Sequence, residues 1–254
     1  MTRIENTREL VALKESGRRL AVILGEVARR AVPGISGEEL NRIAETLIRE
    51  GGDVPACLGY KPQGARRPYP ATLCVSVNDE VVHGIPGERT LASGDIVGLD
   101  LGLIHEGMVT DMAVTVAVGD VDAKAKKLIS ATEEALLCGI KAARAGATTG
   151  DIGHAIEACV LKRGFQVVEE LGGHSVGHSV HEDPFVPNWG ERGEGAQLKE
   201  GLVLALEPIV AEKDPRVFLA KDGYTFKTKD GKRSAHFEHT ILITKKGAEI
   251  ITKA

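Results

Sequence analysis

The sequence is poor in cysteine and has no long hydrophobic run. Its four cysteines are spread along the chain with no CxxC spacing: Cys57, Cys74, Cys138 and Cys159. This pattern argues against a disulfide framework or a zinc ribbon and favours a reducing compartment. No apolar run reaches the roughly 18 residues of a transmembrane helix, and the charged start MTRIENTRELVALKE lacks the apolar stretch of a signal peptide. We therefore expect a cytoplasmic protein with no membrane partner.

Neither sign of charge is in large excess. Lys and Arg number 32 and Asp and Glu number 36, which gives a net charge of −4. This balance argues against a broad nucleic-acid-binding surface. Hydrophobic residues make up 43% of the 254 positions, which is typical of a globular chain. Because no stretch resembles a linker, we predict one domain over residues 1–254, present as a monomer.

The spacing of apolar residues predicts four helices, over residues 6–31, 36–51, 122–144 and 149–164. The starts of the second and fourth helices match at an offset of 113 positions, where Ser36-Gly37-Glu38 corresponds to Thr149-Gly150-Asp151. This match predicts an internal repeat with halves at roughly 6–120 and 122–250. The alternative is that helix starts simply resemble one another.

Two aspartates stand in segments that otherwise read as buried strands. Asp100 lies in IVGLDLGLI and Asp111 in VTDMAVTVAV. A buried carboxylate is costly unless it is paired or binds a metal. A hairpin that turns between His105 and Glu106 would place Asp100 directly opposite Asp111, with Cβ atoms about 4.5–5.5 Å apart. A cation would relieve the repulsion; a solvated sheet face with incidental acids is the alternative.

Two glutamates repeat this anomaly downstream. Glu207 lies in LVLALEPIV and Glu238 in AHFEHTILIT, and these segments contain no Lys or Arg. A buried ion pair could explain one such acid, whereas a shared metal site explains all four. An oxygen-rich set with one imidazole suits Mn²⁺, Fe²⁺, Co²⁺ or Zn²⁺. Two such ions about 3.5–4 Å apart activate water for hydrolysis.

Histidines offer the remaining candidate ligands. The segment GGHSVGHSVHEDP carries His174, His178 and His181 at a spacing that would share one face of a helix. Its glycines favour an extended or irregular segment instead, so a helical zinc triad is not expected. His83, in VVHGIPG, precedes a predicted turn.

Taken together, these motifs resemble one family. HGIP at 83–86, the Asp100 and Asp111 pair, GGHSVG, HEDP at 181–184, LEP at 206–208 and FEHT at 237–240 are similar to the type I methionine aminopeptidases of peptidase family M24. The similarity covers nearly the whole chain, in order. It implies an α+β pita-bread fold, in which two pseudo-symmetric halves form a curved, mostly antiparallel sheet backed by helices.

The resemblance also implies residue roles. Two divalent metal ions would be bound by five ligands, of which Asp111 and Glu238 bridge both ions: Asp100, Asp111, His174, Glu207 and Glu238. Catalysis would use His83, His181 and Glu207, with Glu207 as the proton shuttle. The substrate would contact His83 and His181 and a methionine pocket formed by Cys57, Tyr60, Tyr69, Cys74 and Tyr224. The chain departs from the familiar bacterial pattern at Ser175, Val180, Tyr224 and His236, where a Gly, a bulky aromatic, a Trp and a Gln are common, and its loop over 60–70 is longer than usual.

The expected activity is removal of the initiator methionine from nascent chains that have a small second residue. Their N-termini are the expected partner, and transient ribosome contact is a further possibility. Three rivals remain at this stage. They are a prolidase or aminopeptidase P relative, which usually has a large N-terminal domain, a non-catalytic pita-bread binding module, and a non-haem iron oxygenase that uses His174 with two carboxylates.

Overall fold

Short polar side chains cap the helices at their starts. The computed structural model describes residues 1–62 and 64–254, and within them four helices form: α1 (Thr7–Arg30), α2 (Gly37–Glu50), α3 (Ala123–Ala142) and α4 (Thr149–Lys162). Each helix follows a residue whose side chain accepts the backbone N–H three positions on, namely Asn6, Ser36, Asp122 and Thr148. The four predicted helices are confirmed to within two residues at each end.

The strands form one large and two small sheets. They are β1 (Val54–Pro55), β2 (Leu73–Val77), β3 (Glu80–Val82), β4 (Ile96–His105), β5 (Met108–Ala117), β6 (Gln166–Val167), β7 (Gly172–Ser175), β8 (Glu182–Pro187), β9 (Val203–Leu206), β10 (Ile209–Ala211), β11 (Val217–Leu219), β12 (Phe226–Thr228), β13 (Ser234–His236), β14 (Glu238–Thr244) and β15 (Gly247–Ile250). The large sheet has the order β1-β4-β5-β14-β9-β7-β8, with β2 beside β4 and β15 beside β14. The small sheets have the orders β13-β10-β6 and β11-β12-β3.

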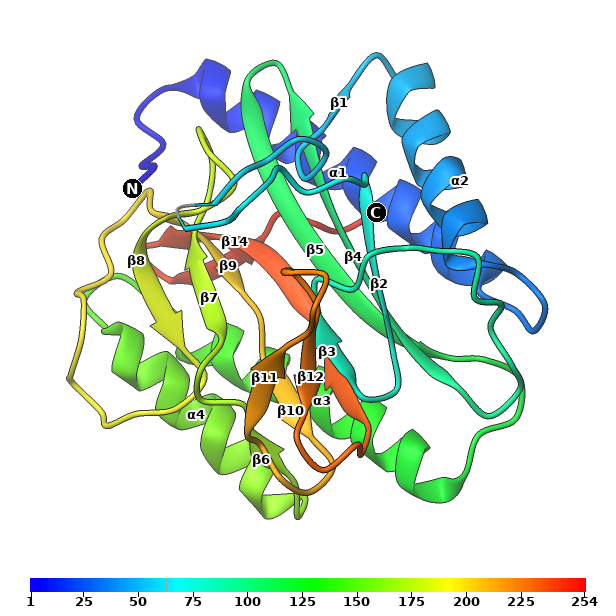
Figure 1. The fold of residues 1–254 in the computed structure, drawn as a ribbon. Helices are drawn as coiled ribbons and strands as arrows, with labels where there is room; N and C mark the ends of the chain where they lie inside the picture. The colour runs from blue at the N-terminus through cyan, green and yellow to red at the C-terminus, as the bar shows by residue number, and fades with distance from the viewer. Residues whose placement is uncertain (63) are drawn as a thin grey trace.

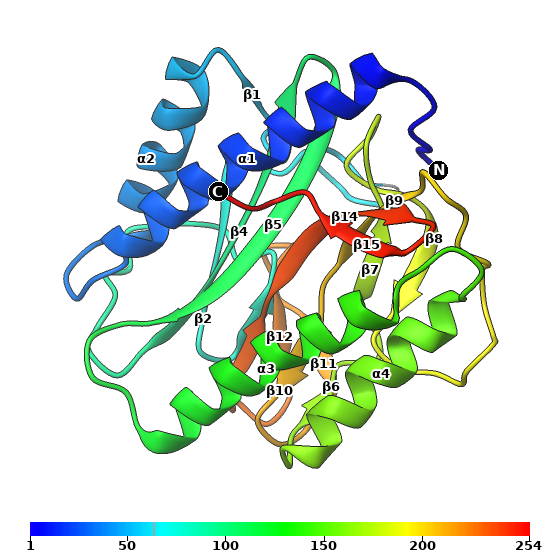
Figure 2. The same cartoon turned by 180° about the vertical axis from the view of Figure 1, so that it is seen from behind.

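All four helices lie on one face of the large sheet, as Figure 2 shows, and the small sheets lie on the other side (Figure 1). Leu20 and Leu24 of α1 pack with Leu40 of α2 against Leu99 and Leu101 of β4, and all five are fully buried. Burying each such side chain stabilises the fold by about 1.5–3 kcal/mol. Because side chains alternate along a strand, β4 turns Asp100 away from the helices and toward the small sheets.

The β4–β5 hairpin corrects the predicted register. His105 pairs with Met108, so Glu106 and Gly107 form the turn, with φ values of 46° and 83°. A two-residue turn of this kind requires positive φ at both central positions. Asp100 therefore pairs with Ala113, and the prediction that it stands directly opposite Asp111 is wrong by two residues. A shift by two keeps both carboxylates on one face.

Backbone hydrogen bonds join the two ends of the predicted loop over residues 60–70. Gly59 N donates to Tyr69 O at 2.9 Å, and Tyr69 N donates to Tyr60 O at 2.8 Å. Residue 63 of this loop lies outside the described residues. Among the helices that the structure describes, none is long and apolar enough to cross a membrane.

Candidate metal centre

One cross-strand row of the large sheet carries three of the predicted carboxylates. Asp100 on β4 pairs with Ala113 on β5, which in turn pairs with Glu238 on β14. The register between β14 and β9, carried one residue past its last pair, places Glu207 opposite Glu238. Cross-strand partners point to the same face of a sheet. The small Ala113 side chain therefore separates the carboxylates of Asp100 and Glu238.

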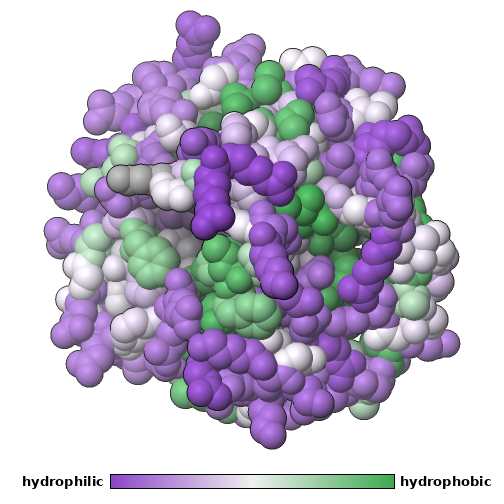
Figure 3. All heavy atoms as spheres, viewed as in Figure 1, coloured by the Kyte–Doolittle hydropathy of each residue, from purple (hydrophilic) through white to green (hydrophobic). Residues whose placement is uncertain are grey.

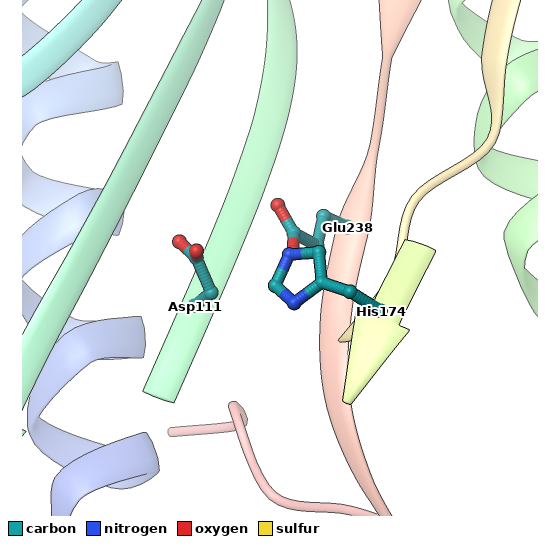
Figure 4. Close-up of side chains that lie close together, drawn as sticks. All are labelled: Asp111, His174 and Glu238. Carbon is teal, nitrogen blue, oxygen red and sulfur yellow. The ribbon is translucent and has the colours of Figure 1, made fainter. Parts of the chain in front are cut away.

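The neighbouring row carries Asp111 and His174. The Asp111 backbone N donates to Thr240 Oγ1 at 2.9 Å, and Thr240 Oγ1 donates to Asp111 O at 2.8 Å. Thr240 pairs with Ala205, which pairs with His174 on β7. One ligand atom from each of Asp111, His174 and Glu238 lies within 4.8 Å of the other two. Figure 4 shows these side chains, which come from β5, β7 and β14 of the large sheet. This spacing suits a single ion that contacts all three.

Glu207 lies where the chain crosses from the large sheet to a small one. It follows β9 of the large sheet, and Pro208 leads into β10 of the small sheet. Phe237 makes the reverse crossing between β13 and β14, and its backbone N donates to Pro208 O at 3.4 Å. Asn188 Nδ2 donates to Glu207 O at 3.0 Å. The crossing brings Glu207 Oε1 to 3.5 Å from His174 Nε2.

The carboxyl groups of this cluster have no cationic partner from Lys or Arg among the ion pairs of the described residues. Burial raises the pKa of Asp100 to about 6. Burial and neighbouring carboxylates hold the pKa values of Asp111, Glu207 and Glu238 well above their usual range. A cation placed among these carboxyl groups would lower their pKa values and favour the ionised forms.

The donor set itself fits a divalent metal. Glu238 Oε1 is buried and has no hydrogen-bond partner within the described part of the chain. His174 Nδ1 lies 3.0 Å from Ser175 O, which can only accept, so Nδ1 carries the proton and Nε2 presents its lone pair. Burial lowers the pKa of His174 to about 3, which keeps the imidazole neutral. Four carboxylates and one neutral imidazole are ligands of the divalent transition metals.

His83 is held beside the cluster in an uncommon backbone conformation. Its φ is 57°, in the left-handed region. The next residue must be glycine, because a Cβ on Gly84 would lie 2.2 Å from Val75 O. Burial lowers the pKa of His83 to about 4, so its imidazole is neutral at pH 7. Non-glycine residues at positive φ are common at functional sites, where the surrounding structure enforces them.

His181 connects the cluster to an apolar pocket. Its ring packs edge-on against that of His174, with centroids 4.4 Å apart, and its Nδ1 lies 3.0 Å from Tyr60 Oη. The pocket encloses about 70 Å³ and is lined by Cys57, Tyr60, Pro62, Tyr69, Cys74, His83, Asp100, Asp111, Val180, His181 and Tyr224. All the residues expected in a methionine pocket are in this list. The pocket is closed on one side by the edge-on contact of Tyr69 with Tyr224.

A wider groove leads from the cluster to the surface. It encloses about 460 Å³ and is lined by Val82, His83, Leu171, Gly172, His174, His181, Glu182, Asp183, Phe185, Glu207 and Ile209. Figure 3 shows hydrophobic side chains near the centre of this face, inside a rim of hydrophilic ones. The small pocket and the groove share His83 and His181, so a chain that enters the groove passes both histidines.

The structure thus brings together every residue that the sequence named for the site. His178 stays outside it, since its ring bonds Thr2 and lies 3.6 Å from Glu9. Sequence reasoning gave no role to Thr240 and Asn188, which contact the backbone of Asp111 and Glu207. It also gave no role to His236, although His236 is two positions from Glu238 and period-two alternation would have placed both on one face.

Comparison with known proteins agrees with this geometry. The model of metallopeptidase family M24 matches residues 11–245. Methionine aminopeptidase 1 of Bacillus subtilis is 43% identical over 246 residues, which is 97% of each chain. The crystal structure of the methionine aminopeptidase of Thermotoga maritima superposes with a TM-score of 0.95 at 42% identity and covers all of both chains.

A prolidase of Pyrococcus horikoshii shares the fold alone. Its TM-score is 0.77 at 22% identity, and the match covers 64% of that chain. The predicted α+β pita-bread fold is confirmed by these structures. On the match of the family model and on relatives more than 40% identical over nearly the whole chain, the protein belongs to metallopeptidase family M24, in the group of the methionine aminopeptidases.

Proposed function

We propose that this protein removes the N-terminal methionine from nascent polypeptides whose second residue is small. The observation that carries the proposal is the position of a small, mostly apolar pocket beside a cluster of four carboxylates and an imidazole. The pocket is of a size and polarity for one unbranched apolar side chain, and the cluster suits the ions of a hydrolytic centre. Methionine aminopeptidases from several bacteria match this chain over nearly its full length.

We assign two divalent ions to the cluster. Asp100 would bind one ion, His174 and Glu207 the other, and Asp111 and Glu238 would bridge both. The closeness of ligand atoms from Asp111, His174 and Glu238 supports the ion that these three residues would share. When bound, such ions polarise the scissile carbonyl and lower the pKa of water. The candidates are Co²⁺, Mn²⁺, Fe²⁺ and Zn²⁺.

The side chains around the ions have separate tasks. Glu207, which faces the open groove, accepts a proton from water and delivers it to the leaving amine. His181 donates a hydrogen bond to the carbonyl oxygen as negative charge develops there. His83 lies near the substrate amine and the leaving group. Cys57, Tyr60, Tyr69, Cys74 and Tyr224 hold the methionine side chain and exclude water from it.

The setting of the reaction follows from the substrate. Initiator methionine is exposed while a chain is still being made, so we place the protein in the cytoplasm, with transient ribosome contact. We further propose that it acts as a monomer.

Release of free methionine from Met-Ala-Ser tests the proposal. The metal-stripped protein should be inactive and should regain activity with Mn²⁺ or Co²⁺, while an Xaa-Pro peptide should stay intact. Asp111→Asn and Glu238→Gln should each abolish turnover without unfolding the chain, and the exposed Asp120→Asn serves as the matched control. Near-normal turnover of Met-Gly-Met by either cluster variant, or preferred cleavage of the Xaa-Pro peptide, would refute it.

A further inference from the structure

His236 lies within the metal centre with an unpartnered nitrogen. Its side chain is buried, and Nε2 lies 3.5 Å from Glu207 Oε2 and 3.7 Å from Glu238 Oε2. In the described part of the chain this nitrogen has no hydrogen-bond partner. A buried polar atom is costly to leave unpaired, so its position between two carboxylates requires an explanation.

The backbone fixes the imidazole in this place. His236 N donates to Thr115 Oγ1 at 2.9 Å, and Thr115 Oγ1 donates back to His236 O at 2.8 Å. His236 is the last residue of β13 and pairs with Ile209 of β10. Of these two strands, β10 begins two residues after Glu207, and β13 ends two residues before Glu238. The side chain is therefore carried by a rigid part of the fold and cannot easily withdraw from the cluster.

Only one tautomer of His236 suits these neighbours. A neutral imidazole carries its proton on only one of its two nitrogens. Once bound metal has ionised Glu207 and Glu238, a lone pair on Nε2 would face two carboxylates and repel them. A proton on Nε2 would instead be a donor to them.

Glu207 lies between two imidazoles with opposite tasks. Its Oε1 lies 3.5 Å from His174 Nε2, whose lone pair points into the cluster, and its Oε2 lies 3.5 Å from His236 Nε2. Both separations exceed an ordinary N–H···O bond by several tenths of an ångström. A shift of Glu207 Oε2 by about 0.3–0.6 Å toward His236 would give an ordinary N–H···O distance.

We propose that His236 is a positioning residue that donates its Nε2–H to Glu207 Oε2 and thereby orients this carboxylate for metal binding. The inference rests on the proposed metal centre and extends it to a residue beyond the five ligands. Partners that orient a ligand in this way typically affect metal affinity by about 10- to 100-fold.

Three variants test the proposal. For each, Co²⁺ binding to the metal-stripped full chain is measured by calorimetry and by the visible absorption of the bound ion. His236→Leu, which removes the donor, should weaken Co²⁺ binding by about 10- to 100-fold and change the absorption band. His236→Gln, which keeps a donor, should restore the affinity to within about threefold of the unaltered chain. His154→Leu, on α4, is the control and should have no effect.

The outcomes separate this proposal from the proposed function. If the unaltered chain binds Co²⁺ and His236→Leu binds it equally well, the role of His236 is overturned and the metal centre stands. If the unaltered chain binds no Co²⁺, both are overturned. Should His236→Leu fail to fold, nitrogen NMR of the Zn²⁺-loaded unaltered chain decides: an Nε2–H tautomer at His236 supports the proposal, and an Nδ1–H tautomer overturns it.

Discussion

Replacing Asp100 by Asn should stabilise the metal-free protein while it destroys the metal site. Burial raises the pKa of Asp100 from 3.8 to about 6. At about 1.36 kcal/mol per pKa unit, ionising this carboxyl at pH 7.5 costs the folded metal-free chain about 3 kcal/mol. The stability gained from the bound proton is fully present below about pH 4 and is lost as the pH rises through about 6. Asparagine has no such proton to lose.

The expected gain therefore depends on pH. Metal-free Asp100→Asn should be more stable than the unaltered chain by up to about 3 kcal/mol at pH 7.5 and by about half of that at pH 5. Added Mn²⁺ should reverse the order at pH 7.5, because it stabilises only the chain that keeps all its ligands.

Urea unfolding with and without Mn²⁺, at both pH values, measures these differences. The exposed Asp120→Asn should change none of the midpoints. The reasoning fails if Asp100→Asn destabilises the metal-free chain equally at both pH values and still gains as much stability from Mn²⁺ as the unaltered chain does.

Three further predictions follow from the site. Metal binding at pH 6 should release protons from Asp111, Glu207 and Glu238, because burial raises the pKa values of these carboxyl groups. The calorimetric heat of binding should therefore vary with the ionisation enthalpy of the buffer, and a heat that does not depend on the buffer contradicts this. Gly84→Ala should cost about 1–3 kcal/mol in urea unfolding, because its Cβ would meet Val75 O at 2.2 Å. Tyr69→Phe should raise KM for Met-Ala-Ser about fivefold with little change in kcat. Tyr69 Oη donates to Gly84 O at 2.8 Å, and loss of this hydrogen bond should loosen the wall of the pocket that holds the substrate side chain. A fall in kcat with unchanged KM contradicts the prediction.

Local signals in the sequence were sufficient for the helices. Asn6, Ser36 and Thr148 are capping residues directly before amphipathic segments, and the helices begin after each of them. The hairpin register was harder, because it depends on where the turn residues take positive φ. Glu106 does so at 46°, although glutamate rarely adopts this conformation, and the predicted turn was displaced accordingly. The single domain and its internal repeat remain predictions.

The carboxylates of the site were predictable because an unpaired acid in a buried strand raises the free energy of the folded state, so its presence in an apolar segment indicates a special role. Their arrangement was not, since it arises from two adjacent rows across strands far apart in the chain. Glu207 reaches the cluster only because the chain changes sheets at Pro208. His236 carries no comparable energetic signal, because a neutral histidine in a strand is not costly; only its spacing of two from Glu238 points to the site.

The metal content of the chain tests the central claim most directly. The stripped protein can be equilibrated with Mn²⁺, dialysed and measured by mass spectrometry of the metal, beside Glu238→Gln. We predict two ions per unaltered chain and a clear loss of bound metal in Glu238→Gln. A chain that retains no Mn²⁺, or that retains as much after the substitution as before it, would contradict the account.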